Sequence, residues 1–345
     1  MRPEAEHALR AFGIQGAIDE VALFGSGHIN DSYSVAVGNQ LYFLQRINTQ
    51  VFPNPSGIEE NLVSLLSTEA SLFVPHYKAG GRFHFEHENG VWRLTAFMGD
   101  CFSPQSAKEA NLSQVGLGFG QFIKVASGLN PADFKEVIPR FHDLEWRWEQ
   151  LLEALQDDMA SRASGVSHLI DQAKAAYKDL KQEKESLVHN GLSVRICHND
   201  CKINNCLLSK TDKSLRHIID LDTVGPGYLF YDFGDLIRTS ITGTPENEPD
   251  LDQIKINLDI FRELSTGFFD ACGQHITAVE RQSLVFGGLY MTYIMGVRFL
   301  ADYLNGDIYY KTSYAEENSI RARNQFKLLE ELQQMRADLE KMINK

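Results

Sequence analysis

Basic residues are scarce in this chain of 345 residues, which has 33 lysine and arginine residues against 46 aspartate and glutamate residues and a formal net charge of −13. They are not concentrated in any one segment. Because proteins hold the nucleic-acid backbone with clustered lysine and arginine, the composition argues against a nucleic-acid partner. The acidity is typical of a soluble protein.

Long apolar runs are also lacking. The first residues, MRPEAEHALRAFGIQG, contain nothing that resembles the apolar core of a secretory signal peptide. The most apolar long stretch, residues 284–300, is shorter than a membrane span, contains three glycines and carries Arg298 near its end. We therefore expect a cytoplasmic protein without a membrane segment, in which this stretch is a buried helix.

Cysteine is rare, with five residues, an odd number. A chain of this length needs no disulfides to stabilise its core, so none are expected. Cys197, Cys201 and Cys206 lie near His198, but they lack the paired C-x-x-C spacing of structural zinc sites. Sulfur ligation of a metal is therefore not expected.

The first hundred residues contain short runs of branched and aromatic residues separated by turn signals. Strands are expected at residues 21–23, 32–37 and 41–47. A capping box formed by Ser56 and Glu59 predicts a helix to about residue 68. Two further strands are expected to meet at Asn89 and Gly90. This order predicts an antiparallel sheet with one helix.

From about residue 99 onward, helical apolar spacing dominates. Expected helices follow a Ser106–Glu109 capping box up to about residue 125, cover residues 141–156 and 167–187, follow a Thr277–Glu280 capping box, and end the chain. One interruption, residues 194–222, has two β-type runs around a polar loop. The chain thus divides at about residue 98 into a sheet-rich and a mainly helical region.

The interruption reads ICHNDCKINNCLLSKTDKSLRHIIDLDTV and carries the chemistry. A strand ending at Cys197 delivers His198 and Asp200 into the polar loop. A turn at residues 210–213 then reverses the chain, so that Asn205 lies opposite Asp220 to within a residue or two. The side-chain oxygens of Asn205 and Asp220 are expected to face one point.

A carboxylate and an amide oxygen at one point suit Mg²⁺, which also keeps water and binds phosphate oxygens. Phosphoryl transfer needs such a metal and a group that accepts the proton of the acceptor hydroxyl. The spacing of Asp200, Asn205 and Asp220 matches the protein-kinase pattern. Local turn bonds would explain each residue singly, but the three together predict a base, Asp200, and two magnesium ligands that serve ATP.

Two nearby residues are expected to support the loop. His198 is interpreted as structural because Asp200 already supplies the base. Asp232, in the sequence YDFGD, is interpreted as an anchor of the loop. Asp222 follows Asp220 at a spacing that points both side chains the same way, and it either assists the metal or supports the loop.

The segment GSGHINDSY lies between two expected strands, and the backbone at Gly25 and Gly27 could cover the phosphates, although a plain hairpin turn is the alternative. The strand at 41–47 lacks the lysine that kinases usually present there. Gln45 or Arg46 must substitute, and only one can face the phosphates; Arg46 has the required charge.

Glu60, on the following helix, is the candidate partner of that substitute. An exposed helix carboxylate is an equal alternative for Glu60. The missing lysine also motivates a second class of function, a nucleotide-binding scaffold without catalysis. The intact Asp200, Asn205 and Asp220 speak against that scaffold.

The blocks HNDCKINN, IIDLDTV and YDFGD resemble the aminoglycoside phosphotransferase and choline kinase superfamily. The blocks GSGHINDSY, FLQRIN, VFPNP, IPRFHDLEWR and GVRFLADYLNGDIYYKT narrow the resemblance to the family of N-acetylhexosamine 1-kinases, over nearly the whole chain. The resemblance implies an α+β, bilobal, protein-kinase-like fold: an antiparallel-sheet, nucleotide-binding lobe at residues 1–98, and a mainly helical lobe at residues 99–345 with the catalytic loop and the sugar site.

The resemblance also implies an activity, the ATP- and Mg²⁺-dependent phosphorylation of the anomeric 1-hydroxyl of N-acetylglucosamine or N-acetylgalactosamine. It places the adenine at a hinge formed by Phe97, Met98 and Gly99. It places the sugar at His28, Asp31, Arg298 and Tyr309, whose planar donors and acceptors suit a polyhydroxyl ligand. The alternative for Arg298 is a snorkelling arginine at a helix end. The alternative activity is phosphorylation of an aminoglycoside or of a choline- or ethanolamine-type alcohol.

Overall fold

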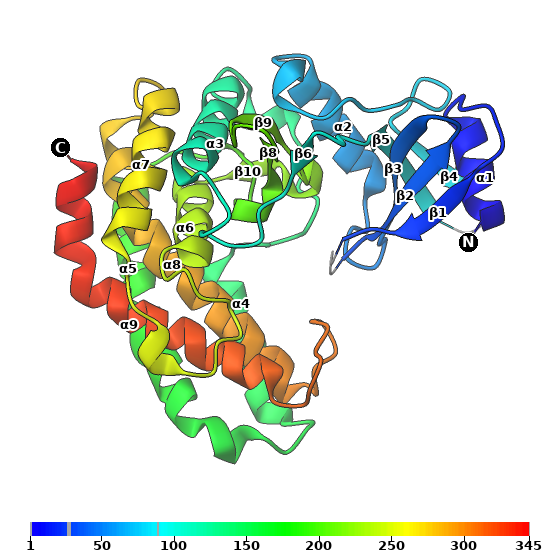
Figure 1. Cartoon of the computed structure of the whole chain (residues 1–345). Coiled ribbons are helices and arrows are strands. Elements are labelled where there is room, and N and C mark those ends of the chain that lie inside the picture. The colour runs from blue at the N-terminus through cyan, green and yellow to red at the C-terminus, as the bar shows by residue number, and fades with distance from the viewer. Residues whose placement is uncertain (1, 26–28, 88–89, 345) are drawn as a thin grey trace.

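The structure, a computed structural model, describes residues 2–25, 29–87 and 90–344. A sheet-rich region formed by the N-terminal part of the chain lies beside a larger, mainly helical region (Figure 1). The expected fold class, an α+β fold with an N-terminal antiparallel sheet and a helical C-terminal region, is confirmed. Gly27, His28 and Asn89 lie outside the described residues.

A five-stranded antiparallel sheet forms the N-terminal region, in the order β1-β2-β3-β5-β4. Its elements are α1 (Arg2–Ala11), β1 (Glu20–Leu23), β2 (Asp31–Val37), β3 (Gln40–Ile47), β4 (His84–His87) and β5 (Gly90–Ala96). Because side chains alternate along a strand, one face carries the buried residues Tyr33, Leu44 and Trp92. Leu9 of α1 and Phe12, directly after that helix, cover that face. The opposite face is turned toward the helical region.

Helix α2 (Pro55–Leu66) follows the three expected strands, but its expected cap is wrong. The N-cap is Asn54, whose side-chain oxygen accepts from the backbone N–H of Gly57 at 2.9 Å, and Pro55 occupies the first turn. Glu59 instead accepts from the backbone N–H of Phe83 at 2.8 Å. A short 3₁₀ helix, η1 (Ala70–Leu72), follows.

The C-terminal region has the remaining elements. Its strands are β6 (Cys101–Phe102), β7 (Arg195–Cys197), β8 (Cys206–Ser209), β9 (Leu215–Ile218) and β10 (Gly225–Gly227). Its helices are α3 (Leu112–Ala126), α4 (Leu144–Asp157), α5 (Ser167–His189), α6 (Leu229–Ser240), α7 (Leu258–Cys272), α8 (Ala278–Leu304) and α9 (Glu317–Ile343). Short 3₁₀ helices are η2 (Pro131–Asp133), η3 (Ala163–Val166), η4 (Ile203–Asn205), η5 (Leu221–Thr223) and η6 (Leu251–Gln253).

Helix α3 also begins differently from the expectation. Its N-cap is Asn111, which accepts from the backbone N–H of Gln114, so no capping box forms at Ser106. Glu109 caps a preceding turn instead, because its carboxylate accepts from the backbone N–H of Gln105 at 2.9 Å. In both helices whose expected cap is wrong, α2 and α3, an asparagine directly before the first helical residue supplies the capping oxygen.

Helix α8 is the centre of the helical region, with α4, α6 and α9 packed around it. It begins at the expected capping box, in which Thr277 and Glu280 bond each other's backbone. Its length and composition would allow a membrane span, but 94% of its most apolar 18-residue stretch is buried inside the protein. The expectation of a buried helix at residues 284–300 is therefore confirmed.

Two small sheets bring the catalytic segment together. Strand β7 pairs with β10, and β6 pairs with the hairpin of β8 and β9, in which Cys206 lies opposite Ile218. The main hydrophobic core is continuous with α2, since Leu62 and Leu65 join it. The expected boundary at residue 98 falls in the connection between β5 and β6 and stays a prediction.

Candidate active site

The loop after β7 holds Asp200 and Asn205 against each other. The amide nitrogen of Asn205 donates to the backbone oxygen of Asp200 at 2.8 Å and to its carboxylate at 3.0 Å. The ammonium group of Lys202 lies 2.5 Å from the other carboxylate oxygen. Burial alone would raise the pKa of Asp200, but Lys202, His198 and Asn205 outweigh it and lower that pKa. Asp200 is therefore held as a carboxylate, the form that the expected base requires.

Asp232 on α6 fixes the start of this loop. Its carboxylate accepts from the backbone N–H groups of His198 at 2.8 Å and of Asn199 at 2.7 Å. Burial raises the pKa of Asp232 to about 7, although these hydrogen bonds oppose the shift. Asn199 adopts a left-handed conformation with φ of 62°, which asparagine tolerates well. Asp232 thus occupies the position expected of a loop anchor.

His198 lies in the interior, and its ring contributes packing. Nε2 donates to the backbone oxygen of Ile219 at 3.0 Å, and the ring meets Phe119 and Phe122 in edge-to-face contacts. Burial lowers the pKa of His198, so the imidazole stays neutral near pH 7. This environment suits a structural role for His198.

Asp220 follows β9 in a left-handed conformation with φ of 60°. The neighbouring Ile219 donates its backbone N–H to the backbone oxygen of Asn205 at 3.0 Å, so Asn205 and Asp220 lie side by side as expected. Solvent reaches Asp220, yet the dense protein around it and the negative charges of Asp222 and Asp200 raise its pKa to about 7. The structure therefore brings Asp200, Asn205 and Asp220 together.

The oxygens at this point are open to a cation. No hydrogen bond joins the Asp220 carboxylate to another described residue. The amide nitrogen of Asn205 is engaged by Asp200, which leaves its amide oxygen without a donor in the described part of the chain. No group of three or more His, Cys, Asp or Glu side chains among the described residues could hold a metal by itself. These two ligands suit Mg²⁺, which completes its shell with water and phosphate oxygens.

Asp222 is committed to the sheet-rich region. Its side chain is buried and pairs with both terminal nitrogens of Arg93 on β5, and Asn30 donates to it at 2.7 Å. Of the two roles open to Asp222, its position favours support of the loop. Arg93 was not identified from the sequence, because no local pattern indicates that β5 pairs with β3 in the register that places Arg93 opposite Gln45.

The two candidates on β3 lie on opposite faces of the sheet. Arg46 pairs with Asp31 at 2.6 Å and stacks over Trp92 on the face that α1 covers. Gln45 lies on the face turned to the helical region, where it accepts from Arg93 at 2.7 and 3.2 Å. Strand alternation therefore selects Gln45, and the position of Arg46 does not support the expected contact with phosphate.

Glu60 likewise does not meet a phosphate-binding side chain. Its carboxylate is 59% exposed and pairs loosely with Lys135 at 3.6 Å. The next residue, Asn61, is buried and donates to the backbone oxygens of Lys135 and Val224 at 2.8 Å. The exposed-carboxylate alternative for Glu60 agrees with this position, and Asn61 is the residue of α2 that ties the two regions together.

The expected hinge, Phe97 to Gly99, directly follows β5. The ring of Phe97 meets Phe24 edge-on, and Phe24 in turn meets Phe43 of β3. Phe24 is 45% exposed, which leaves an apolar wall beside the hinge. The backbone oxygen of Met98 accepts from Cys101, and that of Gly99 accepts from Lys210. Gly25, next to Phe24, has φ of 77°, a conformation that favours glycine.

Arg298 of α8 stacks against aromatic rings. Its guanidinium carbon lies 5.2 to 5.6 Å from the ring centres of Phe141, Tyr309 and Tyr310. No carboxylate of the described residues forms an ion pair with Arg298, whose hydrogen bonds go to Met295 and the hydroxyl of Tyr309. A second arginine, Arg147, is bound only to neutral oxygens nearby, and burial and the charge of Arg298 lower its pKa to about 10.

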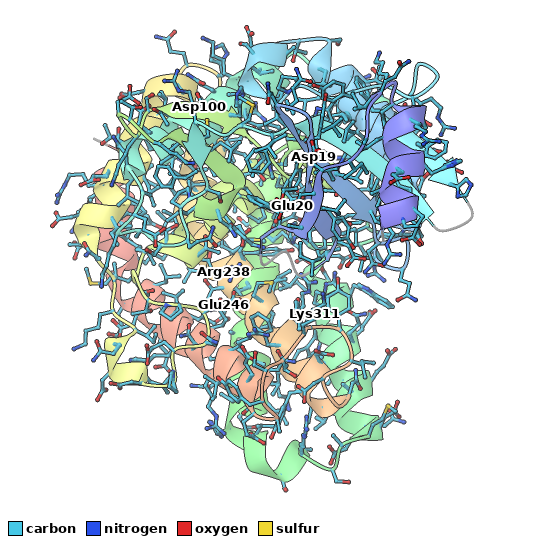
Figure 2. All side chains as sticks on the ribbon, turned by 45° about the vertical axis from the view of Figure 1, so that its right-hand side comes forward. Asp19, Glu20, Asp100, Arg238, Glu246 and Lys311 are labelled. Atoms are coloured by element: carbon cyan, nitrogen blue, oxygen red, sulfur yellow. The ribbon has the colours of Figure 1, made fainter. Side chains whose placement is uncertain are left out.

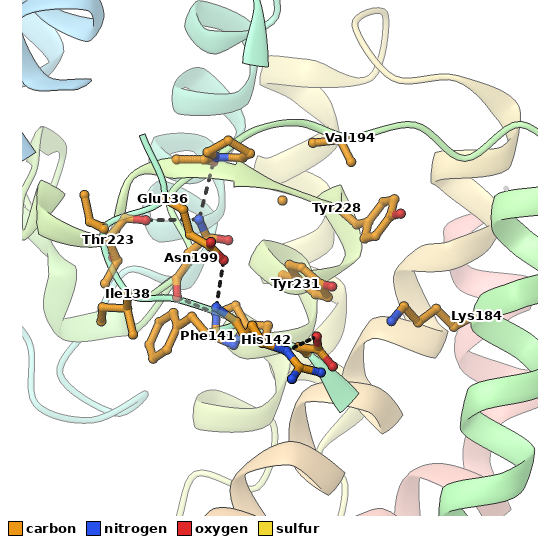
Figure 3. A pocket seen from close by; sticks show the side chains of 16 residues that line it. Glu136, Ile138, Phe141, His142, Lys184, Val194, Asn199, Thr223, Tyr228 and Tyr231 are labelled. Atoms are coloured by element: carbon orange, nitrogen blue, oxygen red, sulfur yellow. Dashed lines mark hydrogen bonds and ion pairs between the residues drawn. The ribbon is translucent and has the colours of Figure 1, made fainter. Parts of the chain in front are cut away.

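His142, which lies next to Asn199 in Figure 3, connects this cluster to the loop after β7. Its Nε2 donates to the backbone oxygen of Asn199 at 2.9 Å, while the neighbouring Phe141 lies under Arg298. Phe141, His142 and Asn199 also line a cavity of about 250 Å³ that extends toward Tyr228 and Lys184. The arginine cluster is therefore linked through Phe141 and His142 to Asn199, the residue before Asp200.

Tyr309 is held in place by Asp302, near the end of α8. The buried carboxylate of Asp302 accepts from the backbone N–H groups of Ile308, Tyr309 and Tyr310 at 2.8 to 3.0 Å. The amide of Asn318 donates to it at 2.9 Å. The carboxylate of Asp302 thus holds the backbone of the segment between α8 and α9 in place. No local sequence pattern indicates this role of Asp302.

Of the other expected sugar contacts, Asp31 lies apart from this cluster. Asp31 pairs with Arg46 in the sheet-rich region and touches neither Arg298 nor Tyr309. His28 is outside the described residues, so both assignments stay predictions.

Asp235 of YDFGD pairs with the buried Arg238 at 2.7 Å, and Arg238 also pairs with Glu246, close to it in Figure 2.

Comparison with known proteins agrees with this arrangement. A family model described as the phosphotransferase enzyme family matches residues 20–264. A microcompartment-associated aminopropanol kinase is similar in fold, with a TM-score of 0.67 and 16% identity over 98% of each chain. The choline kinase LicA from Streptococcus pneumoniae has a TM-score of 0.59 and 14% identity over 96% of this chain and 99% of its own.

A spectinomycin phosphotransferase, solved in complex with ADP and spectinomycin, has a TM-score of 0.54 and 13% identity over 91% of this chain and 90% of its own. Identities this low establish a shared fold, whereas the family match covers well over half of the chain. The chain therefore belongs to the phosphotransferase enzyme family.

Proposed function

We propose that the protein is a cytoplasmic kinase that uses ATP and Mg²⁺ to phosphorylate the anomeric 1-hydroxyl of an N-acetylhexosamine. The observation that carries the proposal on the acceptor side is the cluster of Arg298 with Phe141, Tyr309 and Tyr310, which has no carboxylate partner. The remaining parts of the proposal rest on the catalytic loop and on the hinge.

The donor side has what a nucleotide and its metal require. The rings of Phe24, Phe43 and Phe97 offer an apolar wall for adenine beside the exposed backbone of Gly99. Asn205 and Asp220 would hold Mg²⁺, which neutralises the charge of the transferred phosphoryl group. Asp200, kept ionised by Lys202, is positioned to orient the acceptor hydroxyl and take its proton.

The charge at the acceptor side favours a neutral polyhydroxyl ligand over an amine. A cationic acceptor such as choline, an aminoglycoside or an amino alcohol would meet two arginines, Arg298 and Arg147, that form no ion pair with a carboxylate of the described residues. A guanidinium supplies planar donors to hydroxyl and acetamido oxygens, and aromatic rings suit the apolar faces of a sugar.

An ADP-release assay with and without Mg²⁺ tests the proposal. The acceptors are N-acetylglucosamine, N-acetylgalactosamine, glucose, galactose, choline, kanamycin and aminopropanol. We expect turnover with the N-acetylhexosamines only when Mg²⁺ is present, and a product whose phosphate is lost in mild acid, as an anomeric phosphate is. Turnover confined to choline, kanamycin or aminopropanol would reject the acceptor. Binding of ATP without turnover of any acceptor, unchanged by Asp200→Asn, would favour the scaffold.

A further inference from the structure

The sheet-rich region lacks the cation that kinases place on the third strand. Residues 1–100 contain a single lysine, Lys78, which lies outside the strands and stacks over the ring of Phe83 at 4.6 Å. Among the arginines of this region, Arg46 is on the face that α1 covers and Arg82 is on the surface with Glu59. Arg93 is the arginine of the five strands that lies on the face turned to the helical region.

Arg93 occupies a position next to the missing lysine. It stands opposite Gln45 in the register of β3 and β5, so its guanidinium reaches the level of the strand at which the lysine is expected. The residue is only 6% exposed. Arg93 bonds directly to Asp222, which is two residues after the carboxylate proposed to hold Mg²⁺, and the negative charges of Asp222 and Asp220 both raise the pKa of Arg93.

The hydrogen bonds of Arg93 orient it and leave one donor over. A guanidinium has five N–H donors. Nε and Nη2 donate to the side-chain oxygen of Gln45, and Nη1 and Nη2 donate to the two oxygens of Asp222. Gln45 is itself fixed, because its amide nitrogen donates to the hydroxyl of Ser32 at 3.0 Å. Four of the five donors are thereby used, and one N–H on Nη1 has no acceptor among the described residues.

The negative charge of the carboxylates around this position also favours a cation beside the bound polyphosphate. Three carboxylates, those of Asp200, Asp220 and Asp222, lie near the place where a polyphosphate must bind. Lys202 is engaged by Asp200, so it offsets only one of the three. A polyphosphate added to this site needs positive charge from Mg²⁺ and from the side of the sheet.

We propose that Arg93 contacts a phosphate of the bound nucleotide and replaces the third-strand lysine of other kinases. Its spare N–H binds a phosphate oxygen, while Gln45 and Asp222 hold the guanidinium plane. Asp222 then takes the part that a helix glutamate has elsewhere, which agrees with the surface position of Glu60. The inference rests on the proposed use of ATP.

Calorimetry with a non-hydrolysable ATP analogue, AMP-PNP with Mg²⁺, and separately with adenosine tests this role without depending on turnover. Arg93→Gln is expected to weaken AMP-PNP binding about 10-fold or more, the size typical of a lost charge-assisted hydrogen bond. Adenosine, which has no phosphate, is expected to bind within about 2-fold of the unmodified protein. Arg46→Gln, the same change on the other face, is the matched control and is expected to leave both affinities unchanged.

The loss of Arg93 leaves Asp222 buried without a partner, so Arg93→Gln is paired with variants that keep the fold testable. Asp222→Asn keeps one accepting oxygen for Arg93 and is expected to weaken AMP-PNP binding less than Arg93→Gln does, while the double variant Arg93→Gln/Asp222→Asn is expected to weaken it as much as Arg93→Gln does. Arg93→Lys keeps the charge without the planar fork and is expected to bind with intermediate affinity. Thermal melts establish that each variant is folded.

Two outcomes would overturn the inference in distinguishable ways. If the folded double variant binds AMP-PNP as tightly as the unmodified protein, Arg93 only ties the two regions together. If the unmodified protein binds neither AMP-PNP nor adenosine, the proposed use of ATP fails as well.

Discussion

The ammonium group of Lys202 lies 2.5 Å from a carboxylate oxygen of Asp200, within the same loop. This contact is the main reason why the pKa of Asp200 stays below its usual range despite burial, which acts in the opposite direction. An acceptor hydroxyl needs an ionised base, so the pair widens the pH range in which the proposed base is active.

Lys202→Met is expected to move the acid limb of the kcat/KM profile to higher pH. The sign follows from the pKa: removal of the cation raises the pKa of Asp200, so a larger fraction of the base is protonated at a given acidic pH. The measurement is kcat/KM for the sugar between pH 5 and 9. Lys213→Met, which removes an exposed lysine bonded to the backbone of Glu109, is the control and should keep the original profile.

Asp200→Asn is expected to lower turnover at least about 10²-fold, the range attributed to a lost acid-base group. Nucleotide binding should stay near normal, because the amide retains the size of the carboxylate and the expected ATP contacts lie elsewhere. Steady-state kinetics and calorimetry with ATP measure the two effects separately. Equal losses of turnover and of ATP affinity would assign Asp200 to nucleotide binding.

Asp302→Asn is expected to raise the KM for the sugar about 10-fold and to leave the KM for ATP unchanged. The amide keeps one accepting oxygen, so it can serve two of the four N–H donors that the carboxylate now accepts, and the segment that carries Tyr309 loosens. The control is Asp338→Asn, at a surface pair with Lys341. Similar changes in both KM values would show a general loss of structure.

Gly287→Ala and Gly288→Ala are expected to change stability in opposite directions. A Cβ at Gly287 would collide with the backbone oxygen of Phe230 where α6 crosses α8, and overpacking of this kind costs about 1–3 kcal/mol. At Gly288 the nearest atom is a side-chain carbon of Ile237 at 3.7 Å, so alanine fits and is expected to gain about 0.5–1 kcal/mol of helix stability. Thermal or denaturant unfolding measures both, and a stable Gly287→Ala variant would contradict the close helix crossing.

Local patterns were sufficient to predict the strands of the N-terminal sheet, helices α2 to α5, α8 and α9, and the hairpin of β8 and β9, whereas α1, α6 and α7 were not predicted. The two strands between Asn205 and Asp220 are joined by a strong turn, so their pairing follows from neighbouring residues, although a register shift between Leu207 and Leu208 was not predicted. The capping box at Thr277 was predicted for the same reason, whereas those at Ser56 and Ser106 were wrong because a nearby asparagine caps each helix instead.

Long-range partners could not be predicted from a single sequence. The bonds of Arg93 to Asp222 and of Asn61 to Val224 join residues more than a hundred positions apart, and no local pattern encodes them. The choice between Gln45 and Arg46 depended on which face α1 covers, which is a property of the packed sheet. Charge alone had favoured Arg46, whose side chain lies on the face that α1 covers.

All five thiols are free and buried, and their surroundings raise the pKa of every one of them. The reactivity of these cysteines is therefore low for two reasons: reagents cannot reach the sulfur atoms, and the thiols stay protonated. Alkylating reagents should react only when the chain opens. The rate of thiol labelling therefore reports the rate of unfolding without an engineered probe.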